Sequence, residues 1–355
     1  MADQKPVEDP APVSAPEKRE EPVSAAGTDN AAIKAASATG SVVKEDALAT
    51  ETAAKDAAAL ESAPKPDESK SDEPSYLANN PALKKFFGSL PGLVTSTGHA
   101  EMWGVPLKDS NDIPTVNVLI KFLRANEGNV QAAEDQLCKA LEWRKEINPL
   151  ALVESGQFSA RKFAGLGYLT TYEDEGRLEV FTWNIYGAVK DVKLTFTDTD
   201  EFVKWRATLM ELAVQELKMK DTTEVIPYDG EDPYQMVQVH DYLNVKFFSV
   251  DAVVRTATQK TIEVFATAYP ELLREKFFVN VPAVMGWMYA AVKVFVSKKT
   301  TRKFHPISYG TNLAREFPAA VADKLPKAYG GKGPELDVAG RIVPLVEDAG
   351  KEDLK

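Results

Sequence analysis

The stretch QMVQVHDYLNVKFFS, residues 235–249, contains the predicted central strand of the fold. Apolar and polar side chains alternate from Met236 to His240, which is the period-two pattern of a half-buried strand. On such a strand His240 and Tyr242 point to one face and Asp241 points to the other. A His and a Tyr on one face of an otherwise apolar stretch indicate that this face lines a ligand cavity. The alternative is a buried His–Tyr pair in which the two side chains satisfy each other.

Two helical patterns precede this strand. TVNVLIKFLRA, residues 115–125, has apolar residues at spacings of three and four and ends at Asn126. Asn129 is a suitable N-cap for a second helix, which ends near Asn148-Pro149. Residues 79–150 are therefore predicted to form a small helical lobe, in which Pro91-Gly92 interrupts an earlier apolar segment.

The chain between the lobe and the strand has a mixed pattern. Residues 167–172 and 178–184 are rich in Tyr, Thr, Val, Phe and Trp, and an acidic turn joins them as a hairpin. Asp198 or Thr199 is predicted to cap a helix over 201–217. The polar loop 218–233 is long for a compact domain.

Helices and strands alternate after residue 249. The pattern predicts a helix over 256–269, a strand over 277–281, an apolar helix over 283–296 and a strand over 304–308. The chain after Gly333 is polar and is expected to be loose. This alternation predicts an α/β fold with a largely parallel or mixed sheet and helices on its faces.

The first 74 residues differ in composition from the rest. They consist mainly of Ala, Glu, Lys, Ser, Asp and Pro, and the first aromatic residue is Tyr76. A segment without large apolar side chains does not offset its ordering entropy, so a disordered leader is expected, with a docking or regulatory arm as the alternative. Lys5 and Pro6 without a following apolar run argue against a signal peptide, and the acidic residues argue against a transit peptide.

Composition excludes several classes of protein. Of the 355 residues, 44% are hydrophobic and 27% are charged, which is typical of a soluble globular protein. The net charge of −11 argues against nucleic-acid binding, because phosphate groups bind to positively charged surfaces. Cys138, the single cysteine, excludes an internal disulfide and thiol metal sites, and its helical neighbours predict a small buried thiol. The chain has no run of 18 apolar residues, so no membrane span is predicted.

The sequence has no standard catalytic pattern. It lacks a phosphate-binding glycine loop, an HExxH motif and a GxSxG motif. Its histidines, His99, His240 and His305, do not have the spacing of a zinc site. We therefore expect no enzymatic activity.

The predicted helix over 283–296, AVMGWMYAAVKVFV, is apolar on nearly all sides. A buried core helix is the ordinary interpretation. This segment is followed by SKKTTRK, residues 297–303, which places four cations beside it in an acidic protein. An apolar helix flanked by a basic cluster fits reversible contact with an anionic membrane surface, and about 14 residues are too few to span one.

Three segments resemble a known family. LIKFLRANEGNVQAAEDQLCKALEWRKE (119–146) is similar to the N-terminal helical lobe of the CRAL-TRIO lipid-transfer proteins, the family of the yeast Sec-fourteen phosphatidylinositol transfer protein. The resemblance continues through 269–303 and through LPKAYGGK (325–332), where Ala328 stands at a position that is usually Glu. It covers about 115–332 in order.

TWNIYG (182–187), KWRATLMEL (204–212) and VQVHDY (237–242) further resemble the fungal branch of this family known as Sec-fourteen homologue five, which is described as also binding haem b. The resemblance implies the CRAL-TRIO fold, in which the helical lobe (79–150) packs on an α/β ligand-binding domain (151–332) whose sheet forms the floor of a cavity. Composition adds a disordered tail (1–74) before this fold and a polar C-terminal tail (333–355) after it. The apolar helix over 283–296 matches the position of the family's gate.

The resemblance implies two ligands. For phosphatidylinositol, the headgroup contacts correspond to Glu271, Thr300 and Lys303, which offer an acceptor for hydroxyls, a hydroxyl donor and a cation for the phosphate. The alternative interpretation is a surface lysine and a helix-capping glutamate.

For haem b, the pocket residues correspond to Tyr186, Arg206, His240, Tyr242 and Lys276, with Tyr242 as the axial iron ligand. A tyrosinate is a known haem ligand, which as a hard anion favours ferric iron, and Arg206 and Lys276 suit the propionates. Asn126 replaces an aromatic residue of some relatives, which alters that wall of the pocket.

Three functional hypotheses follow. The first is non-classical phosphatidylinositol binding and transfer between membranes, by a cytoplasmic protein that associates peripherally with endoplasmic reticulum or microsomal membranes. The second is a ferric haem-binding protein in haem homeostasis or the response to oxidants, without significant lipid exchange. The third is a scaffold that presents lipid to a kinase. No obligate protein partner is predicted.

Overall fold

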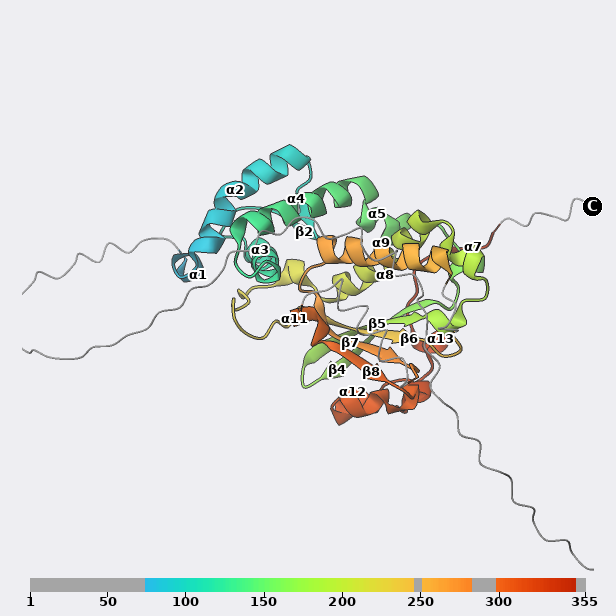
Figure 1. Ribbon diagram of the computed structural model, residues 1–355. Coiled ribbons are helices and arrows are strands. Elements are labelled where there is room, and N and C mark those ends of the chain that lie inside the picture. The colour runs from blue at the N-terminus through green and yellow to red at the C-terminus, as the bar shows by residue number, and fades with distance from the viewer. Residues whose placement is uncertain (1–73, 246–250, 283–297, 349–355) are drawn as a thin grey trace, which may run out of the picture. The chain divides into compact units, whose positions relative to one another are not determined.

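The computed structural model describes residues 74–245, 251–282 and 298–348 (Figure 1). The predicted leader up to residue 73 and the apolar helix predicted over 283–296 lie outside these ranges. No helix in the described ranges is long and apolar enough to cross a lipid bilayer.

The helical lobe is built on the two helices that the sequence predicts. Asn129 caps the second of them, since its side chain accepts a hydrogen bond from the N–H of Ala132 at 3.1 Å. Between residues 75 and 155 the elements are α1 (Ser75–Ala78), α2 (Pro81–Thr97), β1 (Glu101–Met102), β2 (Val105–Pro106), α3 (Ile113–Ala125), α4 (Val130–Ile147) and α5 (Pro149–Ser155).

Helix α2 continues through Pro91, so the predicted interruption at Pro91-Gly92 is wrong. Leu83, Phe86 and Leu90 form one buried stripe at helical spacing. Packing of this stripe outweighs the hydrogen bond that a proline nitrogen does not donate. The helix ends at Gly98, whose φ of 61° is the left-handed conformation that favours glycine.

A five-stranded mixed sheet forms the larger part of the molecule. Its strand order is β4-β5-β6-β7-β8, with β4 and β5 antiparallel and all the following pairs parallel. The predicted hairpin is therefore confirmed as β4 and β5. The strands are β4 (Gly167–Asp174), β5 (Arg177–Ile185), β6 (Met236–Asp241), β7 (Leu273–Val279) and β8 (Phe304–Ile307).

The two faces of the sheet have different partners. Alternate residues of the central strands, including Trp183, Val239 and Phe277, form one buried cluster with Leu313 and Tyr329 from the C-terminal part of the chain. Helices α8 (Thr199–Glu216) and α9 (Ala252–Ala268) contact each other, and their residues share a cavity with the opposite face of β6 and β7. Asp198 caps α8, as predicted, by accepting from the N–H of Glu201 at 3.0 Å.

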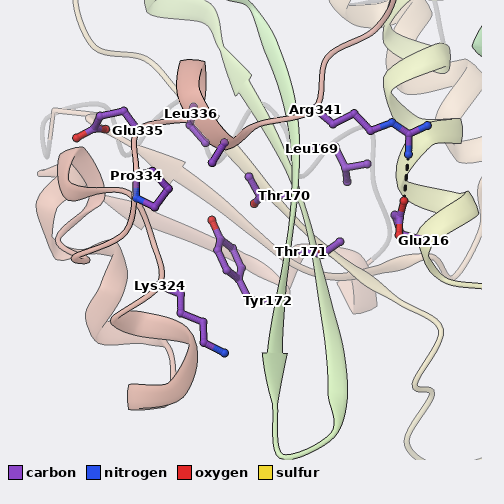
Figure 2. A pocket seen from close by; sticks show the side chains of 11 residues that line it. Leu169, Thr170, Thr171, Tyr172, Glu216, Lys324, Pro334, Glu335, Leu336 and Arg341 are labelled. Atoms are coloured by element: carbon purple, nitrogen blue, oxygen red, sulfur yellow. Dashed lines mark hydrogen bonds and ion pairs between the residues drawn. The ribbon is translucent and has the colours of Figure 1, made fainter.

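The edge strand β4 is covered by the C-terminal part of the chain (Figure 2). Leu169 and Arg341 exchange two backbone hydrogen bonds of 2.7 and 2.9 Å, and the amine of Lys324 donates to the carbonyl of Glu173 at 2.8 Å. A cavity of about 390 Å³ lies between these contacts, where Tyr172 points along the strand. The contacts protect the edge against pairing with another chain.

The chain after Gly333 is not loose within the described residues. Leu336 packs in the core behind the sheet, and α13 (Leu336–Ala339) is followed by β9 (Leu345–Val346), which pairs in parallel with β3 (Phe158–Ser159). Apolar side chains inside this polar segment explain the difference from the prediction. Cys138 is half-buried rather than buried, and its pKa is raised by partial burial and by Glu142.

Several boundaries also differ from the predicted ones. Helix α9 begins four residues earlier than expected because Asp251 caps it, and β7 begins at Leu273 rather than at Phe277. The remaining described elements are short: α6 (Ala160–Phe163), η1 (Tyr186–Ala188), α7 (Val192–Phe196), η2 (Met219–Asp221), α11 (Lys298–Thr301), η4 (Gly310–Glu316), α12 (Ala319–Ala322) and η5 (Lys327–Tyr329).

Candidate functional site

A cavity of about 1210 Å³ lies between the sheet, the helices α8 and α9 and the helical lobe. Its wall mixes aromatic and aliphatic side chains with a few charged ones, which is typical of a site for an amphipathic ligand. All eight residues that the sequence points to are among those that line it: Tyr186, Arg206, His240, Tyr242, Glu271, Lys276, Thr300 and Lys303.

His240 belongs to the floor of this cavity. It lies on β6, in register with Asn184 on β5 and with Phe278 on β7, and its side chain is 5% exposed. Its ring lies edge-on to Tyr186 at 5.4 Å and to Phe278 at 5.6 Å between centroids. Its Nε2 atom is buried and has no hydrogen-bond partner among the described residues.

The electrostatic surroundings keep His240 neutral. Burial lowers its pKa well below the usual value, and the positive charges of Lys276 and Arg206 lower it further. A neutral imidazole retains one acceptor and one donor nitrogen, so His240 is able to exchange a hydrogen bond with a ligand.

Tyr242 lies directly after the last residue of β6. Its N–H donates to the carbonyl of Val279 at 3.1 Å, which keeps it beside β7, and its ring lies 5.5 Å from that of Tyr186 and 6.2 Å from that of Phe278. The rings of Tyr242 and His240 thus contact the same two neighbours. The sequence prediction that they share a face agrees with this arrangement.

The backbone around Tyr242 is fixed by Asp241, which points away from the cavity. Its buried carboxylate accepts hydrogen bonds from the Tyr329 hydroxyl, the Asn280 side-chain amide and the N–H of Leu243, each at 2.8 Å. These three contacts end the strand and begin the turn that carries Tyr242.

Arg206 brings a buried positive charge from α8 to the cavity. Its side chain is 3% exposed, and its guanidinium donates to the side-chain oxygen of Asn184 and lies 5.4 Å from the ring centroid of Phe265. Its Nε atom is buried without a hydrogen-bond partner among the described residues. A polar atom left in this state usually signals an absent partner.

Lys276 supplies a second cation from β7. Its amine lies 5.5 Å from the ring centroid of Phe278 and 5.6 Å from that of Phe304, in the geometry of a cation–π contact. No ion pair of Lys276 with a carboxylate is found within the described residues. Burial, and then the charge of Arg206, lower the pKa of Lys276 to about 7.

The predicted headgroup residues come from two adjacent segments. Thr300 is in α11, and its carbonyl accepts from the N–H of Lys303 at 3.1 Å. The carbonyl of Lys303 in turn accepts from the N–H of Lys276 at 2.8 Å. The side-chain amine of Lys303 donates to the carbonyl of Leu273. Glu271 stands in the turn between α9 and β7 with a φ of 56°. A main-chain hydrogen bond therefore joins Lys303, one of the predicted headgroup residues, to Lys276, one of the predicted haem residues.

Sequence reasoning missed several residues of the cavity wall. Asn184 on β5 and Phe265 on α9 hold the Arg206 guanidinium, and Phe278 contacts His240, Tyr242 and Lys276. The alternation within β5 and β7 was the available signal, because Asn184 and Phe278 are register partners of His240. Asn126 lines the cavity as expected, and its side-chain amide donates to the carbonyl of Phe122 at 2.9 Å.

Comparison with known proteins identifies the family. The CRAL/TRIO domain matches residues 163–331, and the CRAL/TRIO N-terminal domain matches residues 82–139. A relative from Neosartorya fischeri, named phosphatidylinositol transfer protein sfh5, is 67% identical over 285 residues, which are 80% of this chain and 68% of the relative. This chain belongs to the CRAL/TRIO family.

Other CRAL/TRIO proteins give the same result. The protein of the same name from Aspergillus fumigatus is 69% identical over 277 residues, covering 78% of this chain and 65% of that protein. The chain thus spans about two thirds of the length of these relatives. A solved structure, the crystal structure of Sfh5, is 28% identical with a TM-score of 0.62, and the match covers 74% of this chain and 92% of that one. The predicted CRAL-TRIO fold is therefore confirmed, and so is the predicted resemblance of this chain to the Sec-fourteen homologue five branch.

Proposed function

We propose that this protein binds phosphatidylinositol in the 1210 Å³ cavity and exchanges it between membranes. The size of the cavity supports this, because it exceeds the roughly 300–1,000 Å³ of pockets for drug-sized ligands and so leaves room for a larger molecule such as a lipid. So does its lining, in which apolar helix residues such as Val254 and Ile262 share the wall with Lys303. Relatives at 67% and 69% identity carry the name phosphatidylinositol transfer protein.

The headgroup is recognised by Glu271, Thr300 and Lys303 in this proposal. Lys303 supplies a cation for the phosphate, the Thr300 hydroxyl donates a hydrogen bond, and the Glu271 carboxylate accepts from inositol hydroxyls. These three residues line the cavity together.

Exchange requires contact with a membrane but no energy source. The acyl chains move from the bilayer to a cavity of similar polarity, so little free energy is lost. The apolar segment 283–296 and the basic cluster 297–303 provide reversible attachment in this scheme, which fits a cytoplasmic protein that visits endoplasmic reticulum or microsomal membranes.

The same cavity is proposed to bind haem b. The donor set fits the group: Tyr242 offers a phenol oxygen for iron, Arg206 and Lys276 are cations that suit the two propionates, and His240 has a buried nitrogen in need of a partner. Among the described residues no group of three or more His, Cys, Asp or Glu is arranged to hold a metal ion.

When bound, haem supplies a ferric iron with a low potential. The chain's own residues hold and orient it. Asp241 fixes the turn that carries Tyr242, and Tyr186 and Phe278 pack on the Tyr242 ring. His240, kept neutral by burial, is available as a hydrogen-bond partner for the ligand or for the Tyr242 oxygen.

A second candidate function, a ferric haem protein without significant lipid exchange, is favoured by Arg206 and Lys276, two cations of the cavity wall. A neutral acyl chain gives Arg206 and Lys276 no counter-charge, whereas an anionic ligand does.

One experiment separates the two functions. The protein is purified from haem-replete cells, its absorption spectrum is recorded, and its transfer of labelled phosphatidylinositol between vesicles is measured. A Soret band together with transfer supports both ligands, and a colourless protein that transfers lipid supports only the first. A coloured protein without transfer supports the second candidate and contradicts the first.

A further inference from the structure

The corner of the chain between α9 and β7, residues 266–273, is held by side chains of the helical lobe. The last carbonyls of a helix have no partner within the helix. At the end of α9, the Gln136 side-chain amide donates to the carbonyl of Ala266 at 2.9 Å, and the Trp103 indole donates to that of Ala268 at 2.8 Å. Both donors belong to the helical lobe, so the lobe completes a helix of the larger domain.

Glu271 stands in this corner in an unfavourable backbone conformation. Its φ of 56° is in the left-handed region, where a residue with a Cβ atom is strained. Its carbonyl accepts two hydrogen bonds of 3.1 Å, one from the amine of Lys121 and one from the side-chain amide of Gln235. The two donors hold the strained peptide and thereby direct the Glu271 side chain, which lines the cavity.

Lys121 is itself fully buried on α3. Its amine also donates to the carboxylate of Asp232 at 2.6 Å and to the carbonyl of Tyr234 at 2.8 Å, so all three of its protons have partners. Asp232 supplies the counter-charge that a buried ammonium requires. Lys121 is not among the residues that line the cavity.

Lys121 belongs to a polar stripe on α3, formed with Asn117 and Arg124 at helical spacing. Asn117 exchanges hydrogen bonds of 2.9 Å with Glu224 and Ile226, and Arg124 donates to the carbonyl of Tyr228 at 2.8 Å. All three side chains therefore bind the long polar loop 218–233 or its end. Lys121 alone of the three also reaches the 266–273 corner in the described hydrogen bonds.

We propose that Lys121 is the positioning residue for Glu271, and that through it the helical lobe sets the selectivity of the cavity for a polyhydroxylated headgroup. This inference rests on the proposed binding of phosphatidylinositol. Lys121 does not touch the lipid. It fixes the peptide of Glu271, and a fixed peptide presents the carboxylate to the inositol hydroxyls without a further loss of entropy on binding.

A double-mutant cycle tests this coupling. Lys121→Met and Glu271→Gln are each expected to lower the transfer of labelled phosphatidylinositol roughly tenfold, the size of a hydrogen bond to a charged group. The double variant is expected to transfer no more slowly than Glu271→Gln alone, because Lys121 acts only through Glu271. Transfer of labelled phosphatidylcholine, whose headgroup lacks those hydroxyls, should change little in any of the three.

Two further variants keep the test decisive. Asn117→Leu removes a buried polar side chain of the same stripe and is expected to lower the melting temperature while leaving phosphatidylinositol transfer intact. Gln235→Met removes the other donor to the Glu271 carbonyl from a half-buried position, and should slow phosphatidylinositol transfer selectively even if Lys121→Met does not fold.

The outcomes distinguish a failure of the Lys121 role from a failure of the proposed phosphatidylinositol transfer. If Glu271→Gln slows phosphatidylinositol transfer but Lys121→Met and Gln235→Met do not, the function stands and the role of Lys121 is wrong. Independent, multiplying effects of Lys121→Met and Glu271→Gln also overturn that role. If the wild-type protein transfers no phosphatidylinositol, the proposed function is wrong and the inference falls with it.

Discussion

His240 and Lys276 are coupled through their charges across the cavity floor. Burial is the larger cause of the lowered pKa of His240, and the ammonium of Lys276 lowers it further. The pKa of Lys276 is itself lowered to about 7 by burial and by Arg206. These groups are arranged to receive negative charge, and they make the ligand-free protein sensitive to pH in a defined direction.

The stability of the ligand-free protein should rise with pH because of Lys276. Its pKa is about 7 in the folded state and 10.5 without the fold, so the unfolded chain binds more protons between these values. Below pH 7 Lys276 is protonated in both the folded and the unfolded state, so the free-energy cost of burying its charge does not change with pH. We expect the rise in melting temperature from pH 6.5 to pH 9 to be smaller in Lys276→Met than in the wild type. An equal rise in both proteins would show that Lys276 titrates normally.

Tyr242→Phe should remove the haem absorption band while preserving phosphatidylinositol transfer. The substitution deletes the oxygen proposed to bind iron and keeps the ring that packs on Tyr186 and Phe278. Tyr168→Phe is the matched control, because Tyr168 packs behind the sheet, away from the cavity. A band that survives in Tyr242→Phe would assign the iron to another residue.

Lys303→Ala should have the opposite pattern, with slower lipid transfer and retained haem. The expected loss is roughly tenfold, because a charge-assisted hydrogen bond to a phosphate contributes about 1.5–3 kcal/mol. Lys332→Ala removes an exposed amine that pairs with Asp323 and serves as the control. Equal damage to both activities by Lys303→Ala and Tyr242→Phe would contradict the division of the cavity into two groups.

Arg144→Met should destabilise the whole protein. Arg144 on α4 is fully buried, and its guanidinium lies 2.6 Å from Glu211 on α8 and 2.9 Å from Glu101 within the helical lobe. The substitution leaves the buried Glu211 without its cation, which costs about 3–5 kcal/mol of unfolding free energy in urea denaturation. Lys162→Met breaks the half-exposed pair with Glu201 and should cost less than about 1 kcal/mol. Similar losses in the two variants would mean that the Arg144 network contributes little.

The sequence predicted well those features that depend on local patterns. The caps at Asn129 and Asp198, the β4–β5 hairpin and the shared side of His240 and Tyr242 all follow from spacing and residue type within a few positions. The helix through Pro91 did not, because the packing of a long stripe decided it.

Contacts between distant segments had no signal in the sequence alone. Lys121 lies 150 positions before Glu271, and nothing in LIKFLRA indicates that this lysine is buried beneath the 266–273 corner. The ring of Phe265 under Arg206 is a similar case. The resemblance to a family pointed to the cavity residues, but the groups that hold them appear only when the chain is folded.

Competition between the two ligands tests the central claim most directly. The protein is loaded with fluorescent phosphatidylinositol, and ferric haem is added while bound lipid and the absorption band are followed together. A single cavity lined by Tyr242, Lys276 and Lys303 predicts that each haem bound displaces one lipid. Haem that binds without releasing lipid would contradict the account, because the two ligands would then occupy separate sites.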